Sequence, residues 1–214
     1  DLSPVRAMPD VVTAHEGPFV GFAAPSSFRA AQALDAAARS ASWKTTPQPV
    51  SNANLFEHLR AKARMSGART EETGSVEAAL GKSARVLSES YRVAFIQHAP
   101  MEPRAAVAEW NGDRLTVWAG CDGPFRAQEI LAEALGIPRE RVRVIVPDMG
   151  GGFGGKHTAE AAVEAARLAR AAGKPVSVRW PREEEFTWAY CRPAALVECR
   201  GGLSASGALT AWEF

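Results

Sequence analysis

Apolar and polar positions recur along the chain with two different periods, which together predict a mixture of strands and helices. Short apolar or β-branched runs predict strands over 19–24, 84–94, 105–110, 115–119, 142–146 and 175–180. Alanine-rich amphipathic stretches predict helices over 27–42, 54–65, 76–80, 125–135 and 158–172. The order of these elements predicts an α+β or α/β architecture, with one strand–loop–helix–strand unit over 142–180.

Turn and cap residues sharpen several of these boundaries. Asn111-Gly112-Asp113 separates two alternating runs and therefore predicts a β-hairpin. Gly136 and Gly173 follow two of the predicted helices and suit left-handed caps. Ser26 and Ser27 offer an N-cap for the helix that begins there.

Two segments predict irregular structure, and the C-terminal part predicts a further strand pair. Residues 43–52 contain prolines among polar residues and indicate a linker, and 66–75 predicts an exposed loop and a domain boundary. Residues 182–186 predict a charged turn or the start of a helix. The runs 194–198 and 208–214 predict a final strand pair joined by 201–207.

Composition narrows the class of protein. The chain has 214 residues, 46% of them hydrophobic, which is enough for one core or for one core with a small satellite domain. It has 25 basic and 24 acidic residues and a net charge of +1, so no nucleic-acid partner is expected. No apolar stretch approaches about 20 residues, so we expect no membrane-spanning helix.

The cysteines and the chain ends leave questions open. Cys121, Cys191 and Cys199 form no CxxC pair, and an odd number suits free thiols, although Cys191 and Cys199 could pair. The redox compartment therefore stays open. The sequence starts at Asp1 and stops inside a strand-like run, so we expect a fragment of a longer protein.

The glycine run 150–155 is the strongest candidate for chemistry. It lies between a predicted strand and a predicted helix, where backbone amides and the helix dipole favour an anion. Glycines there allow a ligand to approach the backbone closely. A tight turn alone would need fewer glycines, so the run predicts a ligand-facing loop.

Two nucleotide-binding patterns fit the run in part. Gly150, Gly155 and Lys156 match GxxxxGK, but His157 stands where a P-loop has Ser or Thr. Gly150, Gly152 and Gly155 also match GxGxxG. The dinucleotide hypothesis lacks the acidic residue that should end the next strand, since 175–180 ends in Trp-Pro-Arg.

A third interpretation comes from resemblance. The run 149–156, MGGGFGGK, resembles the glycine loop of the xanthine dehydrogenase/aldehyde oxidase family. Three more stretches resemble the same family in its order. They are QHAPMEP at 97–103, LTVWAGCDGPF at 115–125, and WPREEEFTWAYCRP at 180–193. The last one is most similar to large subunits of the isoquinoline 1-oxidoreductase and nicotinate dehydrogenase type.

The resemblance implies a fold and two domains. It covers 76–214 strongly and 1–75 weakly. It implies an α+β fold in which 69–214 is the first part of a mixed-sheet molybdopterin-binding domain. Residues 1–68 would be the end of a smaller, hammerhead-like α/β domain and a linker.

The resemblance also implies an activity. These enzymes hydroxylate an aldehyde or an N-heterocycle carbon with oxygen from water, and a molybdenum cofactor does the redox chemistry. The cofactor would be molybdopterin or its cytosine dinucleotide form. The implied partners are the remainder of the large subunit, a small [2Fe-2S] subunit and, in some relatives, a cytochrome c. The compartment would be cytoplasmic or periplasmic.

Six residues match cofactor-facing positions of the family. Gly151, Gly152, Phe153, Gly154 and Gly155 belong to the loop, and Phe153 would contact a planar cofactor or substrate unless it packs in the core. Asp122 falls where relatives often have a Gln that donates to a molybdenum oxo group. An ionised Asp only accepts hydrogen bonds, so this departure implies a protonated, turned-away or altered position.

Two residues match substrate-facing positions. His157 falls where xanthine-type members have a substrate-binding Glu, and it could instead face solvent. Arg192 lies one position from a substrate-orienting Arg, and a surface ion pair is the alternative. His98, Met101 and Glu102 are expected to shape the domain interior, and Glu183-Glu184-Glu185 is expected to be a solvated face.

We find no general base and name no catalytic residue, because a base must reach the proton that it removes. We therefore expect the isolated chain to be inactive. Two alternatives remain: a non-catalytic structural or assembly fragment of such a subunit, and a P-loop-like nucleotide binder.

Overall fold

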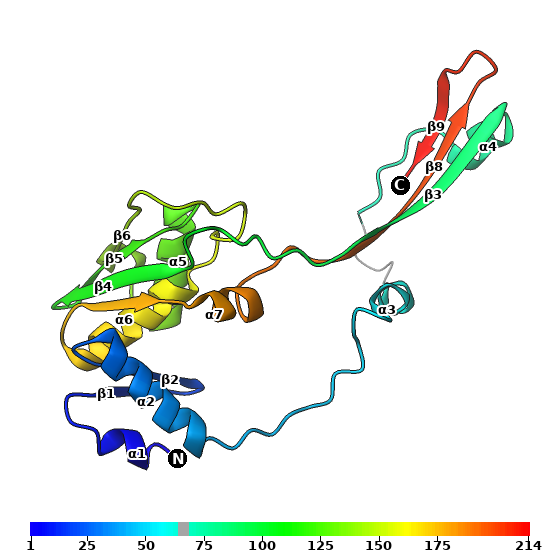
Figure 1. Ribbon diagram of the computed structural model, residues 1–214. Coiled ribbons are helices and arrows are strands. Elements are labelled where there is room, and N and C mark those ends of the chain that lie inside the picture. The colour runs from blue at the N-terminus through cyan, green and yellow to red at the C-terminus, as the bar shows by residue number, and fades with distance from the viewer. Residues whose placement is uncertain (64–68) are drawn as a thin grey trace. The chain divides into compact units, whose positions relative to one another are not determined.

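The computed structural model describes residues 1–63 and 69–214 and contains two compact units, each made of two separated stretches (Figure 1). The first unit comprises Asp1–Lys44 and Gln97–Cys191, and the second comprises Thr45–Ile96 and Arg192–Phe214. The end of the helix predicted over 54–65 and the start of the loop predicted over 66–75 lie outside the described residues. The division into 1–68 and 69–214 stays a prediction.

A four-stranded mixed sheet forms the centre of the first unit, with the order β6-β5-β4-β7. The predicted hairpin is confirmed: β4 (Ala105–Asn111) pairs antiparallel with β5 (Arg114–Ala119) around Gly112, whose φ is +61°. At one edge β6 (Val142–Ile145) runs parallel to β5, and at the other β7 (Val176–Arg179) runs antiparallel to β4. The predicted strand–loop–helix–strand unit therefore joins the two opposite edges of the sheet.

Two helices cover one face of this sheet, and their packing forms the main core (Figure 1). They are α5 (Pro124–Leu135), which ends at Gly136 with φ +64°, and α6 (Glu160–Ala172), which ends at Gly173 with φ +61°. Alternate residues of β4 and β5 point into this core: Ala106, Ala108, Leu115, Val117 and Ala119. Small side chains let α6 approach the sheet closely: Ala161, Ala162, Ala165, Ala166 and Ala169 are all buried.

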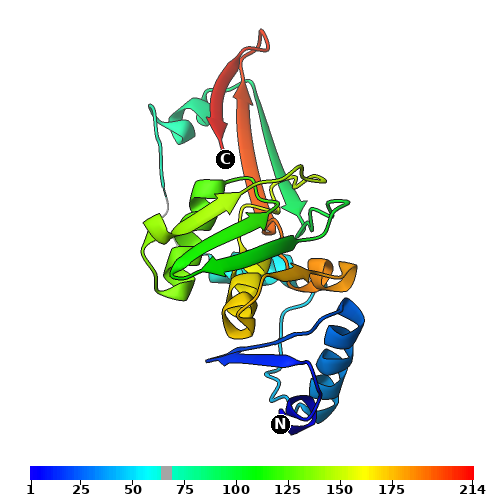
Figure 2. The same cartoon turned by 90° about the vertical axis from the view of Figure 1, so that its left-hand side faces the viewer.

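The N-terminal residues cover the other side of α6. They form α1 (Ser3–Arg6), β1 (Val12–Glu16), β2 (Phe19–Ala23) and α2 (Ser27–Ser40). The β1–β2 hairpin packs through Ala14 and Ala23 against Leu168 of α6, so α6 lies between the hairpin and the sheet (Figure 2). The Ser26 N-cap is confirmed, since its Oγ accepts from the Arg29 amide at 3.2 Å. The elements α1 and β1 were not predicted from the sequence.

The second unit is a three-stranded antiparallel sheet of order β3-β8-β9. Its strands are β3 (Arg85–Val93), β8 (Ala195–Leu203) and β9 (Leu209–Glu213), accompanied by α3 (Leu55–Lys62) and α4 (Val76–Gly81). The final strand pair is confirmed, but the prediction that its first strand stops at 198 was wrong. β8 continues through Gly201 and Gly202 because β3 pairs with it along its whole length.

The remaining elements of the first unit are the 3-10 helix η1 (Arg139–Arg141) and α7 (Arg182–Thr187). The helical start predicted at 182 is therefore confirmed. None of the helices in residues 1–63 and 69–214 is long and apolar enough to cross a membrane.

We predict that Leu131→Ala lowers the free energy of unfolding by about 2–5 kcal/mol, because Leu131 is 0% exposed in the core between α5 and the sheet. Urea denaturation measures this loss. The control Leu34→Ala removes a side chain that is 57% exposed on α2 and should change stability by less than about 0.5 kcal/mol. Equal losses in the two variants would contradict this core.

Candidate functional site

The glycine loop follows β6 and precedes α6, and its backbone has an unusual conformation. Gly151 and Gly154 have φ of +87° and +88°, and Phe153 between them has φ +54°. A non-glycine residue in this left-handed region costs about 1–2 kcal/mol, so the surrounding structure must hold it there. The Phe153 side chain is 75% exposed, so its interpretation as a residue packed in the core is wrong.

Neighbouring side chains occupy the space that a Cβ would need at three of the loop glycines. A Cβ on Gly150 would lie 2.6 Å from Glu102 Cβ, and one on Gly152 would lie 2.7 Å from Asp122 Oδ1. A Cβ on Gly155 would lie 3.0 Å from His98 Cγ. The loop therefore packs directly against the stretches 97–103 and 115–125.

An ion pair between the buried Lys156 and the partly exposed Glu102 holds the two ends of the loop. Lys156 is 1% exposed, and its Nζ donates to Glu102 Oε2 at 2.8 Å. The Gly150 amide donates to the same oxygen, also at 2.8 Å. Desolvation by itself raises the pKa of Glu102, but these two hydrogen bonds and the lysine charge outweigh it and hold the pKa below its usual value.

This ion pair also bears on the P-loop hypothesis. A P-loop lysine extends its ammonium group to the phosphates of a nucleotide. The Lys156 ammonium is instead buried and bound to Glu102. The geometry therefore disfavours nucleotide binding by this loop.

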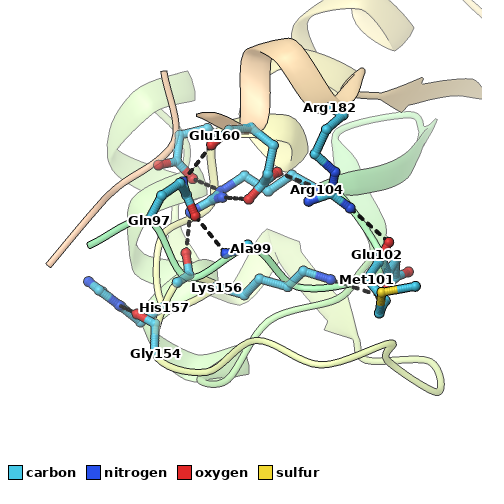
Figure 3. A network of polar contacts seen from close by, with 12 residues as sticks. Gln97, Ala99, Met101, Glu102, Arg104, Gly154, Lys156, His157, Glu160 and Arg182 are labelled. Carbon is cyan, nitrogen blue, oxygen red and sulfur yellow. Dashed lines mark hydrogen bonds and ion pairs between the residues drawn. The ribbon is translucent and has the colours of Figure 1, made fainter. Parts of the chain in front are cut away.

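A second buried network lies under the loop and centres on Arg104 (Figure 3). The Arg104 guanidinium, 4% exposed, donates to Glu185, to Glu160 at 3.2 Å, and to the carbonyl oxygen of Gly155. The Arg104 amide also donates to Glu185 at 2.9 Å. Glu185 is fully buried, so the prediction that 183–185 is a solvated face is wrong for this residue.

The stretch 180–193 joins the same network. The Trp180 amide donates to the Arg104 carbonyl at 2.9 Å, and the Arg104 guanidinium lies 5.6 Å from the Trp180 ring centroid. Gln97 donates to the Glu185 carbonyl and accepts from the Ala99 amide. The sequence did not point to Arg104 as a site residue, although it directly follows the QHAPMEP stretch.

Asp122 and Cys121 lie beside the loop in different environments. The Asp122 amide donates to the Lys156 carbonyl at 3.0 Å, and the Asp122 side chain is exposed beside Gly152. Cys121 is 5% exposed, and burial raises the pKa of its thiol. Met101 is 86% exposed, so the prediction that it shapes the interior is wrong.

The two predicted substrate-binding residues lie in different units. His157 is exposed in the first unit, and its Nδ1 lies 2.7 Å from the Gly154 carbonyl oxygen. Arg192 belongs to the second unit, where its guanidinium donates to the Ala94 carbonyl at 2.8 Å. His157, the loop and Asp122 thus belong to the same unit, whereas Arg192 belongs to the other.

The loop amides are the groups best placed to hold a ligand. Among the described residues, no acceptor takes a hydrogen bond from the amides of residues 151–154. Successive amides beside positive-φ glycines are the kind of backbone donor arrangement that suits an oxygen-rich or anionic group. Within residues 1–63 and 69–214, no cluster of three or more His, Cys, Asp or Glu side chains is placed to hold a metal ion.

This geometry agrees with a comparison against known families. The model of the molybdopterin cofactor-binding domain matches residues 58–214. The chain belongs to this family.

Relatives of this molybdopterin cofactor-binding domain include components of several oxidoreductases. The molybdenum-binding subunit of the Escherichia coli aldehyde oxidoreductase is 37% identical over 142 residues, which are 66% of this chain and 19% of the relative. One of the subunits of nicotinate dehydrogenase from Pseudomonas putida is 30% identical over 143 residues, 67% of this chain and 12% of the relative. The chain thus spans less than a fifth of either relative.

A solved structure shares the fold. Quinoline 2-oxidoreductase from Pseudomonas putida 86 aligns with a TM-score of 0.75 at 23% identity, over 99% of this chain and 32% of that one. The predicted α+β class is therefore confirmed. The matches include aldehyde, nicotinate and isoquinoline enzymes, so the molybdopterin-binding family is shown and the isoquinoline type is not singled out.

We predict that Gly150→Ala destabilises the domain by about 1–3 kcal/mol, because the new Cβ would overlap Glu102 at 2.6 Å. Urea denaturation and hydrogen exchange at the residue-150 amide measure the effect. Gly81→Ala is the control, since a Cβ there meets nothing within 4 Å. Rapid exchange should appear only in the Gly150 variant, and slow exchange in both would refute the packing argument.

The lowered pKa of Glu102 predicts a pH dependence of stability. The ionised carboxylate is favoured in the folded state, so its contribution is complete above the ordinary glutamate pKa of about 4.3. It is lost as the pH falls through the lower pKa of the folded state. Glu102→Gln should flatten this acid limb of the unfolding free energy and also lower stability at neutral pH, where Lys156 loses its partner.

Denaturant titrations over a pH series test this dependence. Glu109→Gln is the matched control, because Glu109 is an exposed residue of β4. It should keep the acid limb of the original chain. If the unfolding free energy of Glu102→Gln fell at acid pH as steeply as that of the original chain, the Lys156–Glu102 pair would contribute nothing to this pH dependence.

Proposed function

We propose that the chain forms part of the large subunit of a molybdenum hydroxylase that oxidises an aldehyde or an N-heterocycle with oxygen from water. One observation carries the proposal. The stretches 97–103, 115–125 and 180–193 all contact or support a single loop, 150–156, whose amides at 151–154 are free to donate. Four family-like stretches that meet at one donor surface support a shared cofactor-facing role.

The loop residues would hold the cofactor through their backbone. We assign cofactor contacts to the free amides of Gly151, Gly152 and Gly154, and to the conformation that Gly155 provides. The exposed Phe153 ring would lie beside the cofactor or substrate. When bound, the molybdenum cofactor supplies the redox chemistry, and the residues of this chain bind and orient the reactants.

Asp122 has a different role from the amides. The Asp122 carboxylate only accepts hydrogen bonds when ionised, so in that form it would suit a donor group of the cofactor rather than an oxo group. Its exposed position beside Gly152 supports such a contact. We assign substrate contacts to His157 and to Arg192.

Several finer assignments belong to the proposal. The cofactor would be molybdopterin or its cytosine dinucleotide form. The partners would be the remainder of the large subunit, a small [2Fe-2S] subunit and, for the isoquinoline or nicotinate type, a cytochrome c. The general base would come from the remainder of the large subunit, so the chain alone should not turn over.

The experiment uses the complete enzyme that contains this chain. We expect molybdenum in a stoichiometric amount, and product oxygen that derives from isotopically labelled water. The variant Gly152→Ala would bring a Cβ to 2.7 Å from Asp122 and should lower the molybdenum content, whereas Gly81→Ala should not. Product oxygen from molecular oxygen, or a complete enzyme without molybdenum, would overturn the proposal.

The two alternatives predict different results. A purely structural or assembly fragment would leave molybdenum content and turnover unchanged in Gly152→Ala, provided that the complete enzyme assembles. A nucleotide-binding loop would give a micromolar calorimetric isotherm with Mg-ATP on the chain. The burial of Lys156 against Glu102 predicts that no such isotherm appears.

A further inference from the structure

Tyr190 lies between the two histidines of the site. Its ring stacks nearly parallel to His98, with centroids 5.8 Å apart and an interplanar angle of 16°. The same ring meets His157 edge-on, with centroids 4.4 Å apart and an angle of 76°. Tyr190 is 37% exposed, so its ring can be reached by solvent while it contacts both histidines. None of the roles proposed above uses it.

The hydrogen bond of His157 determines which ring nitrogen carries a proton. Nδ1 lies 2.7 Å from the Gly154 carbonyl oxygen, and a carbonyl oxygen only accepts. Nδ1 is therefore the donor, and in the neutral ring Nε2 bears a lone pair. Figure 3 shows the His157 ring extending away from the buried Arg104–Lys156 network.

The contacts of Tyr190 complete a circuit of side-chain and backbone contacts that starts and ends at the glycine loop. His98 packs against Gly155, Tyr190 stacks on His98, and His157 contacts Tyr190 and bonds back to Gly154. The hydrogen bond to Gly154 and the contact with Tyr190 thus act on the same exposed His157 ring. An edge-to-face pair favours one relative orientation of the two rings, so this contact favours the observed orientation of His157.

We propose that Tyr190 is a positioning residue, which holds His157 so that Nε2 acts as a hydrogen-bond acceptor toward a substrate. The substrate class that this arrangement selects has an N–H or O–H donor beside the reacting carbon. A ligand that offers only acceptors there finds no partner on the neutral ring. This substrate preference rests on the proposed function, whereas the positioning of His157 does not.

The positioning is tested on the full chain by long-range proton–nitrogen correlation spectra of the His157 ring. The original chain should show Nδ1–H with an unprotonated Nε2. Tyr190→Ala should shift His157 toward a mixture of both tautomers, because the ring can leave the Gly154 carbonyl. Tyr190→Phe retains the aromatic ring and should keep the Nδ1–H form.

The chain offers a matched control, because it contains two tyrosines. Tyr91 is 55% exposed on β3 of the second unit, and Tyr91→Ala should leave the His157 spectrum unchanged. An unaltered His157 tautomer in Tyr190→Ala would overturn the positioning role. So would a change of equal size in Tyr190→Phe, since the ring would then not be what matters.

The substrate preference is tested in the complete enzyme with two ring-matched N-heterocycles, one with an N–H next to the reacting carbon and one N-methylated there. Tyr190→Ala should raise KM for the first roughly tenfold, the scale of one lost hydrogen bond, with little change in kcat. KM for the N-methyl compound should change less than twofold. Equal changes for both compounds would overturn the preference. Absence of turnover in the original enzyme would instead count against the proposed function and leave the spectra to decide the positioning.

Discussion

The buried charge of Arg104 is the constraint on which the site depends. A guanidinium that is 4% exposed must have its donors paired, since an unpaired buried charge is strongly destabilising. Arg104 meets this requirement with Glu185 of α7, Glu160 at the start of α6, and the carbonyl of Gly155. These bonds fix α6, α7 and the glycine loop relative to Arg104. The loop is therefore held in place by the buried network.

The Lys156–Glu102 pair fixes the part of the loop that lies closer to the surface. Glu102 accepts from both the Lys156 ammonium and the Gly150 amide, so it ties the two ends of the loop to one carboxylate oxygen. The amides between them are left without acceptors among the described residues. The loop is held at both ends, and the amides between the ends have no hydrogen-bond acceptor in the part of the chain that the structure describes. Such a loop is preorganised for a ligand, because it loses little conformational freedom on binding. The strained φ of Phe153 is consistent with that arrangement.

The sequence predicted local structure well and long-range structure poorly. The hairpin at Asn111-Gly112 and the helix ends at Gly136 and Gly173 were predictable, because turn and cap residues act on their immediate neighbours. The length of β8 was not, because β3 extends it from a distant part of the chain. For the candidate site, the loop was predictable from its glycines. The pairing of Arg104 with Glu185 was not, since a charged run usually faces solvent and only the fold shows which carboxylate is buried.

The interleaving of the two units has a consequence for how the chain folds as it is made. The sheet of the first unit needs nothing beyond β7, which ends at Arg179, so it can close as soon as that strand leaves the ribosome. β3 is synthesised earlier but pairs with β8, which comes after the whole 97–191 stretch. Until β8 emerges, β3 would lack its strand partner, and unpaired strand backbone favours pairing with other chains. Chaperone contact during synthesis would therefore matter most between the emergence of β3 and that of β8.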